Sequence, residues 1–309
     1  MKIHYGIEHI SIVENAVVTS GTFDGVHLGH QKILKRVVEA AKRENGESVV
    51  ITFWPHPRLV LYPNDGDGLK LLNTFEEKAK LVELQGIDHL ISIPFTKEFS
   101  QLTSEEFIQQ ILIDKIGTKH LIIGYDHKFG KNREGSFEHL KENAHLYGFT
   151  VEEIPREDLE NVGISSTLIR QNLLEGKVEV SNNFLGHNYS VFGKVIHGNE
   201  LGRKIGFPTA NILLGEPYKL IPSDGVYAAI VLLNGVQYKA MVNIGYRPTV
   251  DGQMHTIEAH LFNFNQDIYH QYIEVQFIKM LRTEIKFDSI EALKIQLVKD
   301  KELAIDLLN

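Results

Sequence analysis

The sequence predicts an α/β protein of two domains: a parallel β-sheet covered by helices, followed by an antiparallel β-barrel with a terminal helix. Two observations predict this fold. In the first half, short apolar runs alternate with helical patterns, which is typical of crossover units around a parallel sheet. From about residue 189, strands with period-two patterning follow one another, and one helical pattern closes the chain. We therefore assign 1–185 to the first domain and 186–309 to the second.

The individual elements follow from the periodicity of apolar residues. Strands of the first domain are predicted at 16–21, 48–54, 89–95, 120–124 and 149–154, and helices at 28–45, 75–86, 103–117, 137–148 and 165–176. Thr103 and Glu106 have the spacing of a capping box. Strands of the second domain are predicted at 189–196, 225–233, 236–245, 255–264 and 272–281, and a helix at about 289–307. We expect the joint within 176–190.

Composition excludes several classes of protein. Lys and Arg total 32 against 40 Asp and Glu, so the formal net charge of −8 argues against a bulk nucleic-acid partner. The chain has no cysteine, which excludes disulfides and thiolate chemistry. The N-terminus lacks the apolar run of a signal peptide, and the longest apolar run, 226–233, is far shorter than the ~20 residues of a membrane span. We expect a soluble, cytoplasmic protein without a membrane partner; the sequence identifies no protein partner.

The stretch TSGTFDGVHLGH, residues 19–30, lies where the first predicted strand ends and a helix begins. Unpaired backbone N–H groups and the positive end of the helix dipole make such a junction suitable for phosphate. His27 and His30 lie near the first helical turn, and their imidazoles can stabilise a phosphate that gains charge in a transition state. A metal site and a purely structural turn are the alternatives. The metal site lacks an obvious third ligand, and the turn explains Gly21 and Gly25 but neither histidine.

Two polar groups stand out in the second domain. Thr209 and Asn211 of PTAN alternate along an extended segment, so they share one side, and their hydroxyl and amide oxygens suit Mg²⁺. A polar strand edge after Pro208 is the alternative. Glu258 lies on the polar side of its predicted strand, where its carboxylate can accept a proton from a substrate hydroxyl. By sequence alone, an exposed strand glutamate is the simpler interpretation.

These motifs carry a resemblance to a known family. GTFDGVHLGH resembles the H-x-G-H signature of nucleotidyltransferases. TFWPHP (52–57), GYDHKFG (124–130) and ISSTLIR (164–170) then occur in the order of the adenylyltransferase half of bacterial bifunctional riboflavin kinase/FAD synthetases. GRKIGFPTAN (202–211), GVYAA (225–229), NIGYRPT (243–249) and TIEAHLFNFNQDIY (256–269) resemble the riboflavin kinase half. The resemblance implies a Rossmann-like nucleotidyltransferase domain followed by a riboflavin kinase barrel.

The resemblance also implies two reactions and their sites. Riboflavin and ATP, with Mg²⁺, would give FMN and ADP, and FMN and a second ATP would give FAD and pyrophosphate. For the kinase it implies Glu258 as base, Thr209 and Asn211 on Mg–ATP, a flap with Gly202 and Gly206, and Arg247 in a loop near the flavin. For the adenylyltransferase it implies His27 and His30 at the α-phosphate, with backbone near Gly21 and Phe23. It further implies triphosphate contacts from Ser166, Thr167 and Arg170, and flavin contacts from His56 and Asp126.

Four positions depart from the family pattern. His127 stands where an aromatic residue is usual, and Leu168 where arginine is common. Asn263 and His270 replace Asp and Gly in the kinase half. The first two leave open a riboflavin kinase whose adenylyltransferase half is weak or non-catalytic. A flavin- or ATP-sensing protein without turnover is disfavoured by the complete catalytic set, and another nucleotidyltransferase leaves the second half unexplained.

Overall fold

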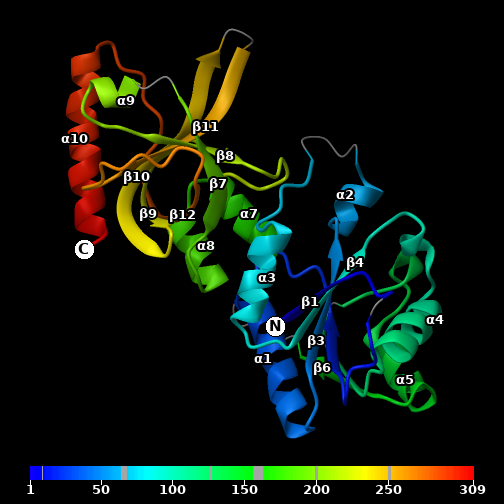
Figure 1. Ribbon diagram of the computed structural model, residues 1–309. Helices are drawn as coiled ribbons and strands as arrows, with labels where there is room; N and C mark the ends of the chain where they lie inside the picture. Colours follow the sequence, from blue (N-terminus) through cyan, green and yellow to red (C-terminus); the bar gives the residue numbers. More distant parts are fainter. Residues whose placement is uncertain (9, 64–67, 126, 156–162, 199–200, 250–251) are drawn as a thin grey trace. The chain divides into compact units, whose positions relative to one another are not determined.

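The computed structural model describes residues 1–309 except 9, 64–67, 126, 156–162, 199–200 and 250–251. Contacts between residues divide the chain into two compact units, Met1–Ser166 and Thr167–Asn309 (Figure 1). The division falls at the start of helix α7 (Ser166–Leu174), which is followed by helix α8 (Val178–Leu185). The domain boundary at 185/186 stays a prediction.

The first unit contains a parallel six-stranded sheet with the order β1-β4-β3-β2-β5-β6. Its strands are β1 (Lys2–Tyr5), β2 (Val17–Ser20), β3 (Ser48–Trp54), β4 (His89–Pro94), β5 (His120–Gly124) and β6 (Thr150–Ile154). Its helices are α1 (Leu28–Arg43), α2 (Pro57–Leu61), α3 (Phe75–Glu83), α4 (Ser104–Phe107) and α5 (Phe137–Tyr147), with shorter or irregular turns η1 (Phe99–Gln101), η2 (Ile108–Ile116) and η3 (Lys131–Arg133). The predicted α/β fold of the first half is confirmed.

Two apolar layers cover this sheet, one on each face. Helices α1 and α3 pack on one layer, where Leu34 and Phe75 meet Val50 of β3. On the other layer, α4, η2 and α5 pack against Val49 and Ile51 of the same strand. Successive residues of a strand point to opposite faces, so a fully buried parallel strand is apolar throughout.

Local signals account for most boundaries in this unit. Thr103 caps α4 through the predicted capping box with Glu106, and the helical path continues as a π-helix over Ile108–Ile116. Strand β1 was not predicted, since it is a four-residue edge strand with mostly exposed side chains and no apolar run. Helix α2 is also absent from the prediction, because its five residues are too few to show a periodicity.

The strand order positions the first candidate site. Strands β3 and β4 lie on one side of β2, whereas β5 and β6 lie on the other. The sheet therefore reverses its direction of growth at β2, and ligands of open α/β sheets bind at the carboxyl ends of the strands beside such a reversal. The loop that follows β2 is the segment 21–27, which leads directly into α1.

The second unit contains a closed barrel with the strand order β10-β11-β8-β7-β12-β9. Its elements are β7 (Ser190–Ile196), α9 (Leu201–Lys204), β8 (Ala210–Leu214), β9 (Gly225–Leu233), β10 (Val236–Thr249), β11 (Gly252–Leu261), β12 (Tyr272–Arg282) and α10 (Ile290–Leu307). All strand pairs between these elements are antiparallel, and Ser289 caps the terminal helix. The predicted barrel with a terminal helix is confirmed.

The two faces of the barrel wall have different partners. Val242, Ile244, Ile257 and Ala259 belong to the alternating set that is at most 2% exposed and fills the barrel. Met241, one residue out of step with this set, instead packs on the layer that includes Ala304 and Leu297 of α10. Helix α10 therefore covers the outer face of the wall, which is where the second candidate site lies.

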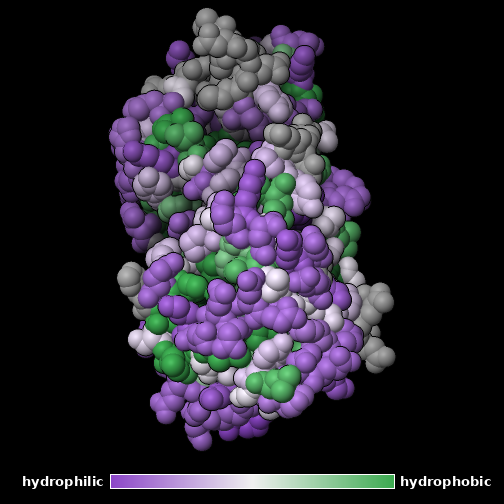
Figure 2. All heavy atoms as spheres, turned by 90° about the vertical axis from the view of Figure 1, so that its right-hand side faces the viewer, coloured by the Kyte–Doolittle hydropathy of each residue, from purple (hydrophilic) through white to green (hydrophobic). Residues whose placement is uncertain are grey.

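One face of the molecule is shown with its atoms coloured by hydropathy in Figure 2. On the face shown in Figure 2, hydrophilic residues predominate and the hydrophobic ones form separate small patches. Among the residues that the structure describes, no helix has the length and hydrophobicity to cross a membrane.

Candidate active sites

The loop after β2 adopts an unusual backbone path. Phe23 and Val26 have positive φ angles of 47° and 39°, and Gly25 between them has 88°. A positive φ is uncommon for any residue with a Cβ and is a strained conformation for a β-branched valine. Both residues are nearly inaccessible, at 3% and 0% exposure. Strain of this kind concentrates where a loop must hold a binding geometry.

Hydrogen bonds from three parts of the chain hold this loop. The Asp24 carboxylate, 2% exposed, accepts bonds from the backbone N–H groups of Leu72 at 3.0 Å and Asn73 at 3.2 Å. The Gln31 side chain donates to Val26 O at 2.9 Å. The Ser166 hydroxyl donates to Asp24 O at 2.8 Å, which brings this predicted phosphate contact to the loop.

The two histidines lie together at the start of α1. His27 is the N-cap, and its Nδ1 accepts a bond from the His30 backbone N–H at 3.3 Å. The imidazole rings stack with 3.7 Å between centroids. A Cβ at Gly29 would lie 3.2 Å from the His27 ring, so glycine leaves room for this arrangement. The stacking places both histidines on one face of the helix start.

Both imidazoles are held in their neutral form. Burial lowers the pKa of His27 to about 4, against a smaller opposite effect of Asp24. Burial, with the nearby His27 and Lys78, lowers the pKa of His30 well below its ordinary value. His30 Nδ1 is buried and has no hydrogen-bond partner. At neutral pH the pair can therefore offer N–H donors to a phosphate, but not positive charge.

The other residues predicted for this site have different outcomes. Gly21 and Phe23 lie in the loop, as expected from the sequence. His56 is 8% exposed and caps α2 by accepting a bond from Arg58 N at 3.2 Å, so a flavin contact stays a prediction. Asp126 lies outside the described residues. Thr167 and Arg170 belong to the second unit, and their phosphate contacts stay predictions.

One departure from the family pattern reaches the strand that carries the loop. His127 Nε2 lies 3.2 Å from the hydroxyl of Ser20, the last residue of β2. Its ring also stacks on Phe129, with 5.8 Å between centroids. His127 therefore keeps the stacking capacity of an aromatic residue and adds a polar contact at the strand end.

Sequence reasoning missed Lys78 near this site. Its side chain is 2% exposed, and its ammonium donates to Thr52 Oγ1 at 3.2 Å. Its position in the helix could have identified it, because it lies three residues after Phe75 and four before Val82 and therefore on the buried face. In the described part of the chain, no group of three or more His, Cys, Asp or Glu side chains suited to a metal occurs here or elsewhere.

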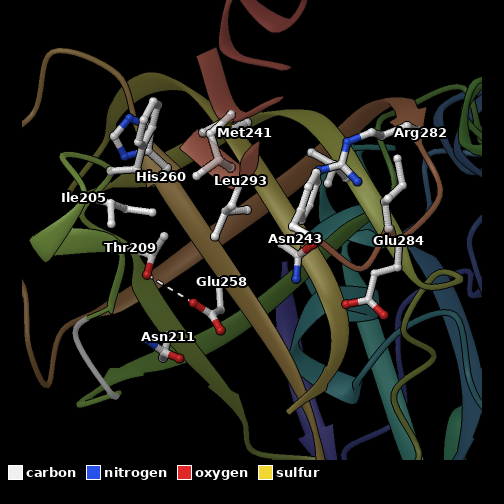
Figure 3. Close-up of a pocket in the computed structure, with 16 residues that line it drawn as sticks. Ile205, Thr209, Asn211, Met241, Asn243, Glu258, His260, Arg282, Glu284 and Leu293 are labelled. Carbon is white, nitrogen blue, oxygen red and sulfur yellow. Dashed lines mark hydrogen bonds between the residues drawn. The ribbon is translucent and has the colours of Figure 1, made fainter. Parts of the chain in front are cut away.

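The second site is a cavity of about 480 Å³ on the outer face of the barrel wall (Figure 3). Strands β8, β10 and β11 contribute polar groups, and α10 contributes Leu293 and Leu297. Ile205, Phe207 and Met241 add to its apolar lining. A volume of this size and a lining that combines apolar side chains with converging polar groups are typical of sites for small molecules.

Thr209, Asn211 and Glu258 meet at one end of this cavity. The Thr209 hydroxyl donates to Glu258 Oε2 at 3.1 Å (Figure 3). Glu258 and Asn211 are directly paired across β11 and β8, so their side chains leave the same face of the wall. The structure therefore brings together the three residues predicted for the kinase site. It also overturns the simpler interpretation of Glu258 as an exposed strand residue, because Glu258 lines the cavity and is partly buried.

The cavity also holds polar residues that were not predicted from the sequence. Asn243 pairs with Glu258 across β10 and β11, and Glu284 and Arg282 follow at the end of β12 (Figure 3). Arg282 binds the buried carboxylate of Asp300 in α10 through Nε and Nη2, with the shortest distance 2.8 Å. This ion pair fastens α10 to the strand that bounds the cavity. Asn243 lies within the NIGYRPT motif, so the sequence offered a reason to include it among the site residues.

His260 forms part of the apolar wall. Its Nδ1 lies 2.7 Å from Pro208 O, a carbonyl that can only accept, so Nδ1 carries the proton and Nε2 is an acceptor. Burial lowers the pKa of His260, and Nε2 has no partner. The bond ties β11 to the residue that precedes Thr209, which fixes the PTAN segment against the glutamate strand.

Of the residues predicted for the flap and the flavin loop, Gly202 lines the cavity, whereas Gly206 is not among its described lining residues. Gly202 lines the cavity from α9, and its carbonyl accepts a bond from Phe207 N at 2.8 Å. Gly206 has a φ of 89°, which turns the chain toward Thr209. Flap motion of this segment stays a prediction. The structure describes only the backbone of Arg247, in β10.

Two family models match the chain. The model of FAD synthetase matches residues 9–168, which contain the histidine pair. The model of riboflavin kinase matches residues 185–308, which contain the cavity with Glu258.

Full-length relatives join both activities in their names. A bifunctional riboflavin kinase/FMN adenylyltransferase of Buchnera aphidicola is 42% identical over 308 residues, covering 98% of this chain and 97% of the relative. The protein of the same name from Haemophilus influenzae is 39% identical and covers 98% of both chains. A crystal structure named Macrolide-efflux Protein, from Streptococcus pneumoniae, has a TM-score of 0.89 and 33% identity, with 98% of this chain and 99% of that chain covered.

Proposed function

The chain belongs to the family of bifunctional riboflavin kinase/FMN adenylyltransferases, and from this premise we propose that it converts riboflavin to FAD in two ATP-dependent steps. The kinase transfers the γ-phosphoryl group of ATP to riboflavin and releases ADP. The adenylyltransferase joins the AMP part of a second ATP to FMN and releases pyrophosphate. The observation that carries the proposal is that each family match contains one of the two sites described above.

In the kinase, Glu258 accepts the proton of the terminal ribityl hydroxyl of riboflavin. The hydroxyl oxygen then attacks the γ-phosphorus, and the bond to the ADP oxygen breaks. Positioning and charge neutralisation provide most of the catalysis in such transfers. The Thr209 hydroxyl, bonded to Glu258 at 3.1 Å, holds the carboxylate at the end of the cavity. The apolar walls exclude water around the flavin ring.

The residues at this end of the cavity fit a magnesium ion. Thr209, Asn211 and Glu258 place three kinds of oxygen donor together, and Mg²⁺ prefers oxygen ligands. A Cβ at Gly198 would overlap the Asn211 amide, so glycine keeps the space beside that donor open. We propose that Thr209 and Asn211 hold Mg²⁺ with ATP, where the ion would neutralise charge on the phosphates.

In the adenylyltransferase, the FMN phosphate is itself the nucleophile, so no strong base is required. Its oxygen attacks the α-phosphorus of ATP, and pyrophosphate leaves. The neutral His27 and His30 donate hydrogen bonds to the α-phosphate as its charge grows, and the backbone N–H groups at the start of α1 add to them. Ser166, Thr167 and Arg170 are proposed to bind the triphosphate, and His56, Asp126 and Arg247 to contact flavin.

The kinase-only alternative makes the first half of the chain a weak or non-catalytic adenylyltransferase. The match to FAD synthetase spans 9–168. The loop before the histidine pair has positive φ angles at Phe23 and Val26, and such backbone strain is typical of binding sites. We therefore favour two activities. We also propose that the enzyme works in the cytoplasm, where the ATP for both reactions is produced, and that its partners are small molecules rather than nucleic acid.

Chromatographic separation of flavins over time tests the proposal. The purified protein is incubated with Mg–ATP and riboflavin in one tube and with Mg–ATP and FMN in another. We expect FMN and then FAD in the first tube, and FAD in the second. Accumulation of FMN without FAD in either tube would refute the adenylyltransferase, and no conversion of riboflavin would refute the kinase.

A further inference from the structure

The mechanism above leaves a buried cation without a role. Lys78 in α3 is only 2% exposed. Its burial is unfavourable by itself, because the charged ammonium loses its interaction with water. Burial lowers its pKa to about 8, against a smaller raising effect of Asp24. Because lysine is almost never fully buried without a partner, the contacts of this ammonium indicate what it does.

The ammonium lies beneath the phosphate-binding loop. It donates to Thr52 Oγ1 at 3.2 Å, and this hydroxyl donates in turn to Thr22 O in the loop at 3.3 Å. The positive charge of Lys78 contributes to the lowered pKa of His30 by electrostatic repulsion. The same ammonium lies 5.3 Å from the centre of the Trp54 ring. Lys78 is thus placed at the carboxyl end of β3, beside the start of α1.

The protein around Lys78 leaves hydrogen-bonding capacity unused. An ammonium has three N–H donors, and only the bond to Thr52 joins it to a described residue. The nearby Asp24 carboxylate is not paired with it by contact, and its oxygens accept two backbone N–H groups instead. His30 Nδ1 beside it is also buried without a partner. Two such groups at one helix start point to an anion with several oxygen acceptors.

Charge considerations lead to the same ligand. Burial keeps both His27 and His30 neutral near pH 7, so the imidazole pair brings no positive charge to the phosphates. Lys78 is the cation that the described residues place next to this pair. A charge in a buried site is screened less by salt and water than one at the surface.

We propose that Lys78 supplies a fixed positive charge to the adenylyltransferase site, beside the contact proposed above for Arg170, and stabilises the triphosphate of ATP, and then pyrophosphate, at the start of α1. This inference rests on the adenylyltransferase activity proposed above. If Lys78 were purely structural, its replacement would lower the stability of the fold and leave the affinity for phosphates unchanged. Exchange of a buried ionic group for an apolar one of similar volume is often neutral or stabilising, so Lys78→Met should lose ligand affinity without losing stability.

Calorimetric titration with inorganic pyrophosphate and Mg²⁺ tests the proposal on the full chain. We expect Lys78→Met to weaken pyrophosphate binding by about 10- to 100-fold, the range for a unit charge several ångströms away in a partly buried site. Lys78→Arg should keep most of the affinity. Lys80→Met is the matched control, because it removes an exposed positive charge from the same helix. FMN formation from riboflavin reports the integrity of the second unit in every variant.

Several results would overturn the inference. One is wild-type pyrophosphate affinity in Lys78→Met, and another is an equal loss in Lys80→Met. A loss accompanied by a lower unfolding temperature in Lys78→Met and Lys78→Arg alike would indicate a structural lysine. If the wild type forms no FAD from FMN, the proposed function fails, whereas the titration still decides whether Lys78 binds pyrophosphate.

The pH dependence of FAD formation provides a test that needs no apolar variant. The titratable groups that interact with Lys78 are Asp24 from the loop and His30 from α1, while Glu77 neighbours it on α3. Because the pKa of Lys78 is about 8, kcat/KM for ATP should fall above that pH in the wild type. Lys78→Arg should move this fall to higher pH, and a profile identical to the wild type would contradict the proposal.

Discussion

The ion pair between Arg282 and Asp300 yields a prediction about the second unit. Three guanidinium–carboxylate distances of 2.8 to 3.0 Å join the end of β12 to α10. The side chains are 16% and 3% exposed, and the Gln296 amide donates to the same carboxylate at 2.8 Å. Asp300→Asn keeps the shape but removes the negative charge, and it turns one acceptor into an N–H₂ group that faces the guanidinium.

The magnitude follows from burial. Removal of one partner of a buried ion pair costs about 3–5 kcal/mol, because the remaining charge is left without compensation. For a unit of this size that corresponds to a fall in Tm of roughly 10 °C. Since Leu293 and Leu297 of α10 form one wall of the cavity, a loosened helix should also raise KM for riboflavin. FAD formation from FMN should stay unchanged.

The single tryptophan allows the two units to be followed separately. Trp54 lies in the first unit, so its fluorescence in urea should be unaffected by Asp300→Asn, whereas circular dichroism should show an earlier transition. Asp306→Asn is the control, because it removes an exposed carboxylate from the same helix. The double variant Arg282→Met/Asp300→Leu should regain most of the stability. A loss below about 1 kcal/mol in Asp300→Asn would refute the reasoning.

Three further predictions concern the reactions and their pH dependence. Glu258→Gln should lower kcat of FMN formation by about 10²- to 10⁴-fold and spare FAD formation from FMN; an equal loss of both rates would contradict separate sites. His30→Ala should do the reverse, with FAD formation falling by about 10²-fold or more, and chromatography of both reactions measures it. Because burial lowers the pKa of His27 from 6.5 to about 4, the unfolded chain binds this proton more readily between those values. The contribution of His27 to the stability of the first unit should therefore fall by about 2 kcal/mol from pH 7 to pH 5, and His27→Gln should reduce the pH dependence of the Trp54 urea transition by that amount, while the dependence due to His30 stays.

Periodicity was sufficient for most of the fold. Buried parallel strands such as β3 are mostly apolar on both faces, and amphipathic helices such as α1 show the 3.6-residue repeat, so both are visible in the sequence. Helix α8 falls within 176–190, which we expected to be the joint between domains. Its eight residues are too few to show a clear helical periodicity, so the sequence does not distinguish this helix from an irregular connection. The edge strand β1 depends on its pairing with β4 rather than on its own residues.

The sequence by itself determined most of the candidates for the chemistry, because phosphate and metal sites need specific residue types at close spacing. His27 with His30, and Thr209 with Asn211, are each near in sequence, so local geometry brings them together. Glu258 was identified by resemblance, and only the pairing of β11 with β8 shows that it meets Thr209.

Only the tertiary structure decided the electrostatics of both sites. Burial makes the histidine pair neutral and places the ammonium of Lys78 beside it, although 48 residues separate Lys78 from His30. Arg282 likewise finds Asp300 through the packing of α10 on the barrel wall. Burial and long-range proximity depend on how elements pack, and no local pattern encodes them.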